Sequence, residues 1–371
     1  MYQLMGEFKI EKMAIRYSQF VPQLYNYCLS LGFERKKMMP SRAFCSDETQ
    51  GYPAILLAQH FGTFPFDHGQ VGGRVATDRN GPHAHHGEDL IIVQASHVGY
   101  DPSSRRFGIY QRQRTEQKEF GANCGKLNQV LNWYQATYRH ASCAIRLGNF
   151  EGTAAISIDN ALLNPNRSEG LFLHLDRLLK APNIAPLRIL STSKVFEAGS
   201  FLLSSLPANL WSGPMRPIGT CLSADLFHFQ REPVVGPEGL DLLERAVAPA
   251  MPSLVTSQNP MLDAARFHTQ IEFDRAYRAI QDEPAYDGKN ILFVSGLNVD
   301  ISLNNENSFP MTKFVPWAAF ARLRDGTNFL LEQADLFDSL ASQSAQSPDR
   351  IALDSAIAAM AELKTIDLST P

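Results

Sequence analysis

The chain has 371 residues, of which 44% are hydrophobic and 19% charged, and its 34 basic and 38 acidic side chains give a formal net charge of −4. This composition excludes disordered and collagen-like chains. The near balance of charge, without a long lysine or arginine cluster, argues against nucleic acid or an anionic membrane as a partner.

The apolar runs are far shorter than the roughly 20 residues that cross a bilayer. The N-terminus lacks the apolar stretch of a secretion signal, so we expect a cytoplasmic protein that does not enter a membrane. The five cysteines are an odd and low number for a secreted disulfide framework, which leaves their thiols available for metal binding or chemistry.

Periodicity predicts the elements of the first half. Apolar residues at three-to-four spacing predict a helix over Val21–Leu31. The continuous apolar run Leu90–Val93 is typical of a buried central strand. An apolar stripe over Leu127–Tyr138 predicts a helix that begins just after Cys124, which would place this cysteine at the positive end of the helix.

The second half continues the alternation of helices and short buried strands, which indicates the α/β class. The expected helices are Leu171–Lys180, Pro237–Val247, Pro260–Gln281 and Pro348–Leu363. The expected strands are Leu187–Leu190 and Ile291–Val294. A polar break at Asn164–Ser168 suggests two regions, residues 1–165 and 166–371. The runs Leu90–Gly99 and Ile291–Asp300 are similar, with Asn298 in the place of His97, but chance explains this adequately and a degenerate duplication stays open.

Histidines and cysteines concentrate in one part of the chain. Six of the ten histidines fall within residues 60–97, between Cys45 and Cys124. Thiolate and imidazole together suit zinc, which accepts mixed sulfur and nitrogen ligands. No Cys-x-x-Cys pair occurs, which argues against a structural zinc finger.

Cys45, His97 and Cys124 are separated by 52 and 27 residues, and each is expected at the end of an element. Ligands so placed can converge at one edge of a parallel sheet, where α/β folds usually have their sites. Three protein ligands leave the fourth zinc position open, as in catalytic sites. Asp47 follows Cys45 closely enough to bind the metal or to accept a hydrogen bond from its water. Separate buried cysteines and a core histidine would explain the same residues.

These residues belong to a series of motifs that resembles the limiting-CO2-inducible B/C family, whose members resemble β-class carbonic anhydrases. The motifs are Phe44–Glu48, His60–Gly62, Gly72–Gly73, the run Leu90–Val93 leading to Ser96–Asp101, and Asn123–Leu127. Their order, spacing and strand context match the family pattern, and together they are fairly specific. The resemblance covers roughly Pro40–Ala136.

The resemblance implies a β-carbonic-anhydrase-like core with a mainly parallel sheet flanked by helices, plus a C-terminal α/β extension, assembled as a homodimer. Residues 1–165 would form the zinc domain, and residues 166–371 an extension or degenerate second copy of unknown role. Cys45, His97 and Cys124 would hold Zn²⁺, with Asp47 as the nearby carboxylate. The implied activity is reversible hydration of CO2 to bicarbonate by zinc-bound hydroxide.

The sequence also departs from the family pattern. Lys126 stands where an alanine is expected after Cys-Gly, and no arginine follows Glu48. An arginine partner for Asp47 must therefore come from elsewhere, and Arg105, Arg106 and Arg112, which lie between the histidine and the second cysteine, are candidates. Solvation at the surface explains any one of these arginines as well.

Two other functions remain open. Cys45 could act as a nucleophile with His97 as its base and Asp101 or Asp47 orienting the imidazole, as in a Cys/His hydrolase, which needs only one cysteine. Alternatively, Asp47 could fill the fourth zinc position permanently, which would make the protein a catalytically inactive zinc-binding relative that acts as a scaffold or regulator.

Overall fold

The computed structural model of the chain describes residues 8–70, 73–75, 89–111, 120–233, 235, 239–302 and 311–362. The chain divides into two compact units. We call residues 2–124 together with 268–371 the sheet unit, and residues 125–267 the inserted unit. These units differ in extent from the two regions expected from the sequence, and the role of residues 166–371 as an extension stays a prediction.

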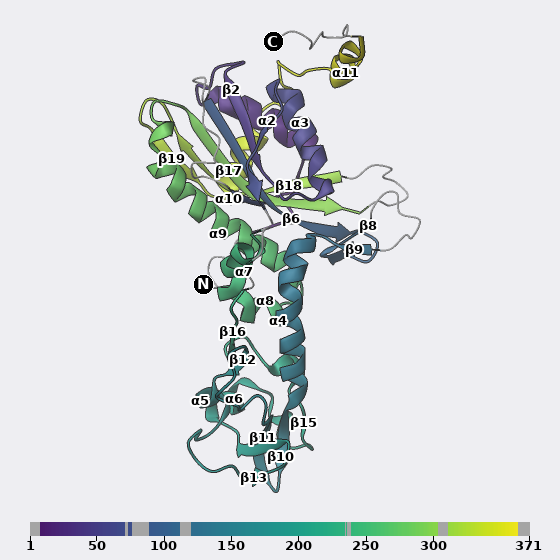
Figure 1. Ribbon diagram of the computed structural model, residues 1–371, viewed down its shortest axis with the longest axis vertical. Coiled ribbons are helices and arrows are strands. Elements are labelled where there is room, and N and C mark those ends of the chain that lie inside the picture. The colour runs from purple at the N-terminus through teal and green to yellow at the C-terminus, as the bar shows by residue number, and fades with distance from the viewer. Residues whose placement is uncertain are drawn as a thin grey trace, which may run out of the picture. The chain divides into compact units, whose positions relative to one another are not determined.

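The sheet unit is built on an eight-stranded sheet (Figure 1). Its path is β1 (Ile15–Arg16), β18 (Met311–Arg322), β17 (Ile291–Ile301), β6 (Asp89–Asp101), β2 (Met38–Ala43) and β3 (Phe66–Asp67), while β19 (Asn328–Leu331) pairs with β18 and β7 (Arg106–Phe107) with β6. The central strands β17, β6, β2 and β3 are mutually parallel, and β18 adds to β17 in the antiparallel sense. The expected α/β class with a mainly parallel central sheet flanked by helices is confirmed.

Helices cover both faces of this sheet. Ile91 and Val93 of β6 belong to the core cluster with α2 (Tyr17–Ser30), α3 (Gly51–Phe61) and α10 (Gln333–Ala341). Leu90 and Ile92 point the other way, into the cluster with the C-terminal part of α9 (Pro260–Asp282). Burial on both faces explains why β6 reads as a continuous apolar run instead of an alternating one.

The similar runs noticed in the sequence are neighbours in the sheet. Strands β6 and β17 pair in parallel with Leu90 opposite Ile291 and His97 opposite Asn298. Residues after the inserted unit therefore lie in the same sheet as the strand that carries His97.

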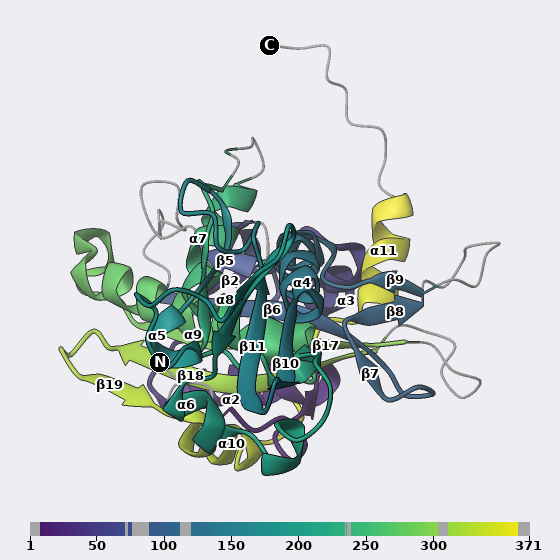
Figure 2. The ribbon, with the colours of Figure 1, turned by 90° about the horizontal axis from the view of Figure 1, so that it is seen from below.

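The inserted unit begins with α4 (Gly125–Ala144) and contains a second, antiparallel sheet. The strand order of that sheet is β13 (Arg188–Ile189), β14 (Ser193–Glu197), β11 (Thr153–Asp159), β10 (Ile145–Phe150) and β15 (Arg216–Pro217), and β12 (Gly170–Leu173) pairs separately with β16 (Phe227–Gln230). Figure 2 shows β10 and β11 side by side, as their pairing requires. The helices are α5 (Leu175–Leu178), α6 (Ser200–Ser205), α7 (Leu240–Val247) and α8 (Met251–Thr256).

The remaining short elements of the sheet unit are β4 (Gly69–Gln70), β5 (Arg74–Val75), β8 (Ile109–Gln111), β9 (Phe120–Ala122) and α11 (Leu353–Glu362). Among the described residues, no helix combines the length and apolar character needed to span a membrane.

Most expected elements are confirmed, including the helix directly after Cys124 and the long helix from Pro260. The helix expected over residues 171–180 is wrong, because the segment that starts at Gly170 pairs with β16 and leaves only the short α5. The last helix begins at Leu353 and not at Pro348. Pro348 and Asp349 form a turn instead, and the Ile351 amide donates to the Gln59 carbonyl at 2.8 Å rather than within a helix.

Candidate metal centre

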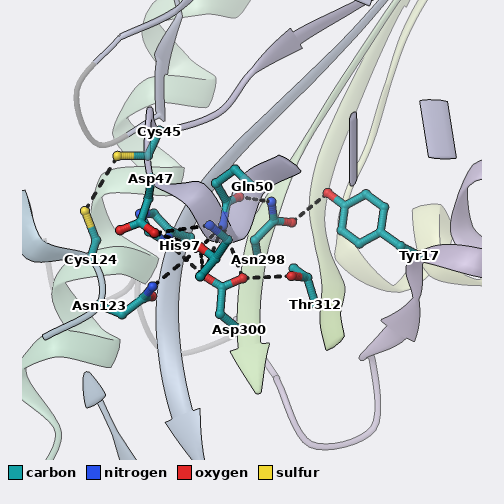
Figure 3. Close-up of polar contacts among 11 residues, drawn as sticks. Tyr17, Cys45, Asp47, Gln50, His97, Asn123, Cys124, Asn298, Asp300 and Thr312 are labelled. Carbon is teal, nitrogen blue, oxygen red and sulfur yellow. Dashed lines mark hydrogen bonds and ion pairs between the residues drawn. The ribbon is translucent and has the colours of Figure 1, made fainter. Parts of the chain in front are cut away.

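The two cysteines and the histidine that are expected to bind a metal lie close together within the sheet unit. Cys45 follows the end of β2, His97 lies in the second half of β6, and Cys124 directly precedes α4. Because β2 and β6 are parallel, their carboxyl ends lie at the same edge of the sheet. One ligand atom from each of the three residues lies within 4.8 Å of the other two. Figure 3 shows the two sulfur atoms facing each other, and they are 3.9 Å apart.

Backbone contacts fix Cys124 beside the strand that carries His97. The Gly99 amide donates to the Asn123 carbonyl at 2.9 Å, and the Asn123 amide donates to the Gly108 carbonyl at 3.1 Å. A Cβ atom on Gly99 would lie 2.4 Å from the Ile109 carbonyl oxygen and 3.0 Å from the Cβ of Asn123. Glycine is required here because only a residue without a side chain allows this close approach.

The donor set fits a metal ion. In a tetrahedral site with Zn–S bonds of about 2.3 Å, two sulfur ligands lie about 3.8 Å apart, close to the 3.9 Å between the sulfurs of Cys45 and Cys124. All three side chains are buried, and His97 is only 1% exposed. Its Nε2 atom is buried without a hydrogen-bond partner, although Nδ1 is bonded. A metal ion would satisfy that nitrogen.

The charges of the three side chains depend on one another. Burial by itself lowers the pKa of His97. The attraction of Cys124 and the hydrogen bond with Asp300 together outweigh burial, so the pKa of His97 lies well above its ordinary range. The hydrogen bond with Cys45, together with burial, raises the pKa of the Cys124 thiol. A bound metal would take the place of the protons on these sulfurs, because the thiolate and not the thiol is the ligand.

A carboxylate that the sequence did not indicate lies behind His97. Asp300 of β17 accepts a hydrogen bond from His97 Nδ1 through Oδ2 at 2.9 Å, and the Asp300 side chain is 1% exposed. Thr49, Gln50 and Thr312 also bond to this carboxylate. The only signal in the sequence was the similarity of the two strand runs, which sets the end of β17 beside the end of β6.

The expected carboxylate Asp47 is placed by a local turn. Its Oδ1 accepts from the Thr49 backbone amide at 3.2 Å, so Asp47 caps the short 3₁₀ turn Glu48–Gln50. Asp47 is partly buried and lies near Cys45 and His97 in Figure 3. No ion pair between Asp47 and an arginine is found among the described residues.

Of the arginines proposed as partners of Asp47, Arg105 and Arg106 lie in the described part of the chain, and Arg106 is exposed in β7. Arg105 is exposed on the turn after β6, where it adopts a φ of 55°. Arg112 lies outside the described residues. Asp101, an alternative orienting group for His97, instead accepts hydrogen bonds from the backbone amide and hydroxyl of Ser104 at 2.8 and 2.5 Å.

Comparison with solved structures relates this architecture to a known fold. No protein-family model matches the chain, and no curated protein sequence does. The crystal structure of PtLCIB4, a homolog of the limiting CO2-inducible protein LCIB, aligns with a TM-score of 0.52 and 13% sequence identity over 86% of this chain and 95% of that chain. A mutant of PtLCIB4 aligns with a TM-score of 0.51 and 12% identity over 87% and 94% of the two chains. The resemblance expected from the motifs is therefore confirmed in the fold: this chain has the fold of an LCIB homolog.

Proposed function

We propose that the protein is a zinc-dependent carbonic anhydrase that catalyses the reversible hydration of CO2 to bicarbonate. The observation that carries the proposal is the buried group of Cys45, His97 and Cys124, whose ligand atoms lie within 4.8 Å of one another. The fold shared with a homolog of the limiting CO2-inducible protein LCIB supports the same chemistry. The family resemblance adds a homodimer to the proposal.

The chemistry of the donors favours zinc. Two thiolates and one imidazole suit zinc better than magnesium or calcium, which prefer oxygen ligands. Three protein donors leave one coordination position for solvent. When bound, the metal supplies Lewis acidity that makes water a nucleophile near neutral pH.

The chain itself would orient the reacting water. We assign this role to Asp47, because the bond from the Thr49 backbone amide to Oδ1 fixes the carboxylate and leaves Oδ2 to accept a hydrogen bond from water. An arginine would hold Asp47 away from the metal and keep the fourth position open. Arg105, Arg106 and Arg112 remain the candidates for this part of the proposal.

Replacement of one sulfur tests the proposal. We expect purified wild-type protein to contain one zinc per chain and to hydrate CO2 in a stopped-flow assay, and Cys45→Ala to lose both. Cys28→Ala is the matched control, because Cys28 is also a fully buried cysteine of the sheet unit but packs in the apolar core. Unchanged zinc content in Cys45→Ala would remove Cys45 from the site.

The hydrogen bond between His97 and Asp300 favours a second candidate function, a Cys/His hydrolase. In such an enzyme Cys45 would be the nucleophile, His97 its base and Asp300 the carboxylate that orients the imidazole. The proximity of a second buried sulfur argues for metal binding instead. Stoichiometric zinc without CO2 hydration at any pH would favour the third possibility, an inactive relative that acts as a scaffold or regulator.

A further inference from the structure

We propose that Asp300 is a positioning residue of the metal centre: its carboxylate keeps the proton of His97 on Nδ1 and thereby directs Nε2 to the metal. This inference rests on the proposed zinc site and deepens it. It also gives the strand after the inserted unit a defined part in that site.

The placement of Asp300 is a consequence of strand register. Asp300 lies opposite Gly99 in the parallel pair of β17 and β6, two positions beyond His97. Its Oδ2 atom reaches His97 Nδ1 at 2.9 Å, and both side chains are almost completely buried. Water therefore does not compete for this hydrogen bond.

The surroundings of Asp300 consist of hydrogen-bond donors. Thr49 Oγ1 donates to Oδ2 at 2.8 Å, Thr312 Oγ1 donates to Oδ1 at 2.9 Å, and Gln50 Nε2 donates to both oxygens at 3.1 and 3.0 Å. An ionised carboxylate has acceptors only, and its two oxygens accommodate these bonds together with one from His97. The donors also offset the cost of burying the charge.

A chain of side chains fixes the direction of these bonds (Figure 3). The Tyr17 hydroxyl donates to Asn298 Oδ1 at 2.7 Å, and Asn298 Nδ2 donates to Gln50 Oε1 at 2.6 Å. This leaves the amide nitrogen of Gln50 for Asp300. The reverse direction would turn the Gln50 oxygen toward a carboxylate, which has no proton to donate.

The proton of His97 follows from this arrangement. Because the carboxylate of Asp300 only accepts, His97 Nδ1 must carry a hydrogen, and Nε2 is then the nitrogen whose lone pair is available to a metal. The buried Nε2 atom has no hydrogen-bond partner. Carboxylate–histidine–metal arrangements of this kind orient the ring and raise the basicity of the ligand.

Asp300→Asn tests the positioning role while it keeps the shape of the side chain, because an amide is nearly isosteric with a carboxylate but carries hydrogen-bond donors. With its nitrogen at the position of Oδ2, the amide would face His97 Nδ1 and favour the tautomer with the proton on Nε2, which cannot bind metal. With its nitrogen at the position of Oδ1, it would face the donor group of Gln50. Either orientation weakens the hold on the Nδ1 proton of His97, because the first removes the acceptor and the second replaces a charged acceptor with a neutral one.

The experiment measures zinc affinity by competition with a chromophoric chelator, without reference to activity. We expect Asp300→Asn to bind zinc about 10- to 100-fold more weakly than wild type. Asp89→Asn is the matched control, since Asp89 is also 1% exposed and accepts two hydrogen bonds from Asn290, at the opposite end of β6. Equal zinc affinity in Asp300→Asn and wild type, or an equal loss in the control, would overturn the proposal.

Nitrogen-15 NMR of histidine-labelled wild-type protein loaded with zinc provides a test that needs no variant at Asp300. We expect His97, assigned by its loss in His97→Gln, to bind the metal through Nε2 and to carry a proton on Nδ1. Coordination through Nδ1 would overturn the proposal. If wild-type protein binds no zinc, both the proposed function and this inference fail. If zinc binds but its affinity is insensitive to Asp300→Asn, this inference alone fails.

Discussion

His97 on β6 lies directly opposite Asn298 on β17 in a parallel strand pair. From this register, the carboxylate two residues after Asn298 reaches the imidazole, and the Asn298 amide continues the hydrogen bonds to Tyr17. The candidate metal centre therefore combines donors from residues 45–124 with a carboxylate from beyond the inserted unit. Both parts of the sheet unit are needed to build it.

The second sulfur distinguishes a metal centre from a cysteine nucleophile. We expect Cys124→Ala to lose zinc and CO2 hydration, because the remaining Cys45 and His97 provide too few ligands. Cys143→Ser serves as the control, since Cys143 is exposed on α4. Metal analysis and stopped-flow kinetics on both variants make the comparison. Activity that survives Cys124→Ala would instead support the hydrolase.

Gly99 allows the approach of Cys124 to His97. We expect Gly99→Ala to cost about 1–3 kcal/mol of folding free energy through overpacking and to weaken zinc binding, because its Cβ would collide with the Ile109 carbonyl 2.4 Å away. Gly121→Ala is the control, since a Cβ there meets no atom within 4 Å. Denaturant unfolding and zinc titration of the two variants provide the measurement. Similar behaviour of the two would show that the close approach at Gly99 is unimportant.

A carboxylate far along the chain anchors the segment before α11. Asp349 accepts hydrogen bonds from Arg35 and Tyr25, and those bonds lower the pKa of Asp349 to about 2. Because the pKa is lower in the folded state, the stabilisation is complete above the unfolded value of about 3.9 and is lost as the pH falls through about 2.

We therefore expect Asp349→Asn to lower the melting temperature at pH 7, with a difference from wild type that shrinks below about pH 4. Asp354→Asn, a change at an exposed position of α11, serves as the control. Thermal unfolding from pH 7 to pH 3 tests this. A difference that stays constant over that range would show that the charge of Asp349 does not contribute.

The sequence allowed prediction of the parts of the site that depend on local pattern. Cys124 was placed at a helix start by the apolar stripe that follows it, and His97 in a central strand by the run before it. Asp300 could not be found in this way, because its contact with His97 spans 203 residues and depends on the register of two strands. The helix expected over residues 171–180 failed for a similar reason, since pairing with a strand more than fifty residues later overrode its local pattern. The roles of Asp47, Arg105 and Arg112 stay predictions.

X-ray absorption spectroscopy of the zinc-loaded protein tests the central claim most directly, because it reports the atoms bound to the metal. The proposed site requires two sulfur ligands at about 2.3 Å and one imidazole nitrogen at about 2.0 Å, with a light atom completing the shell. We expect this pattern in wild type and no bound zinc in Cys45→Ala. A spectrum without sulfur, or a purified protein that takes up no zinc, would contradict the proposed metal centre.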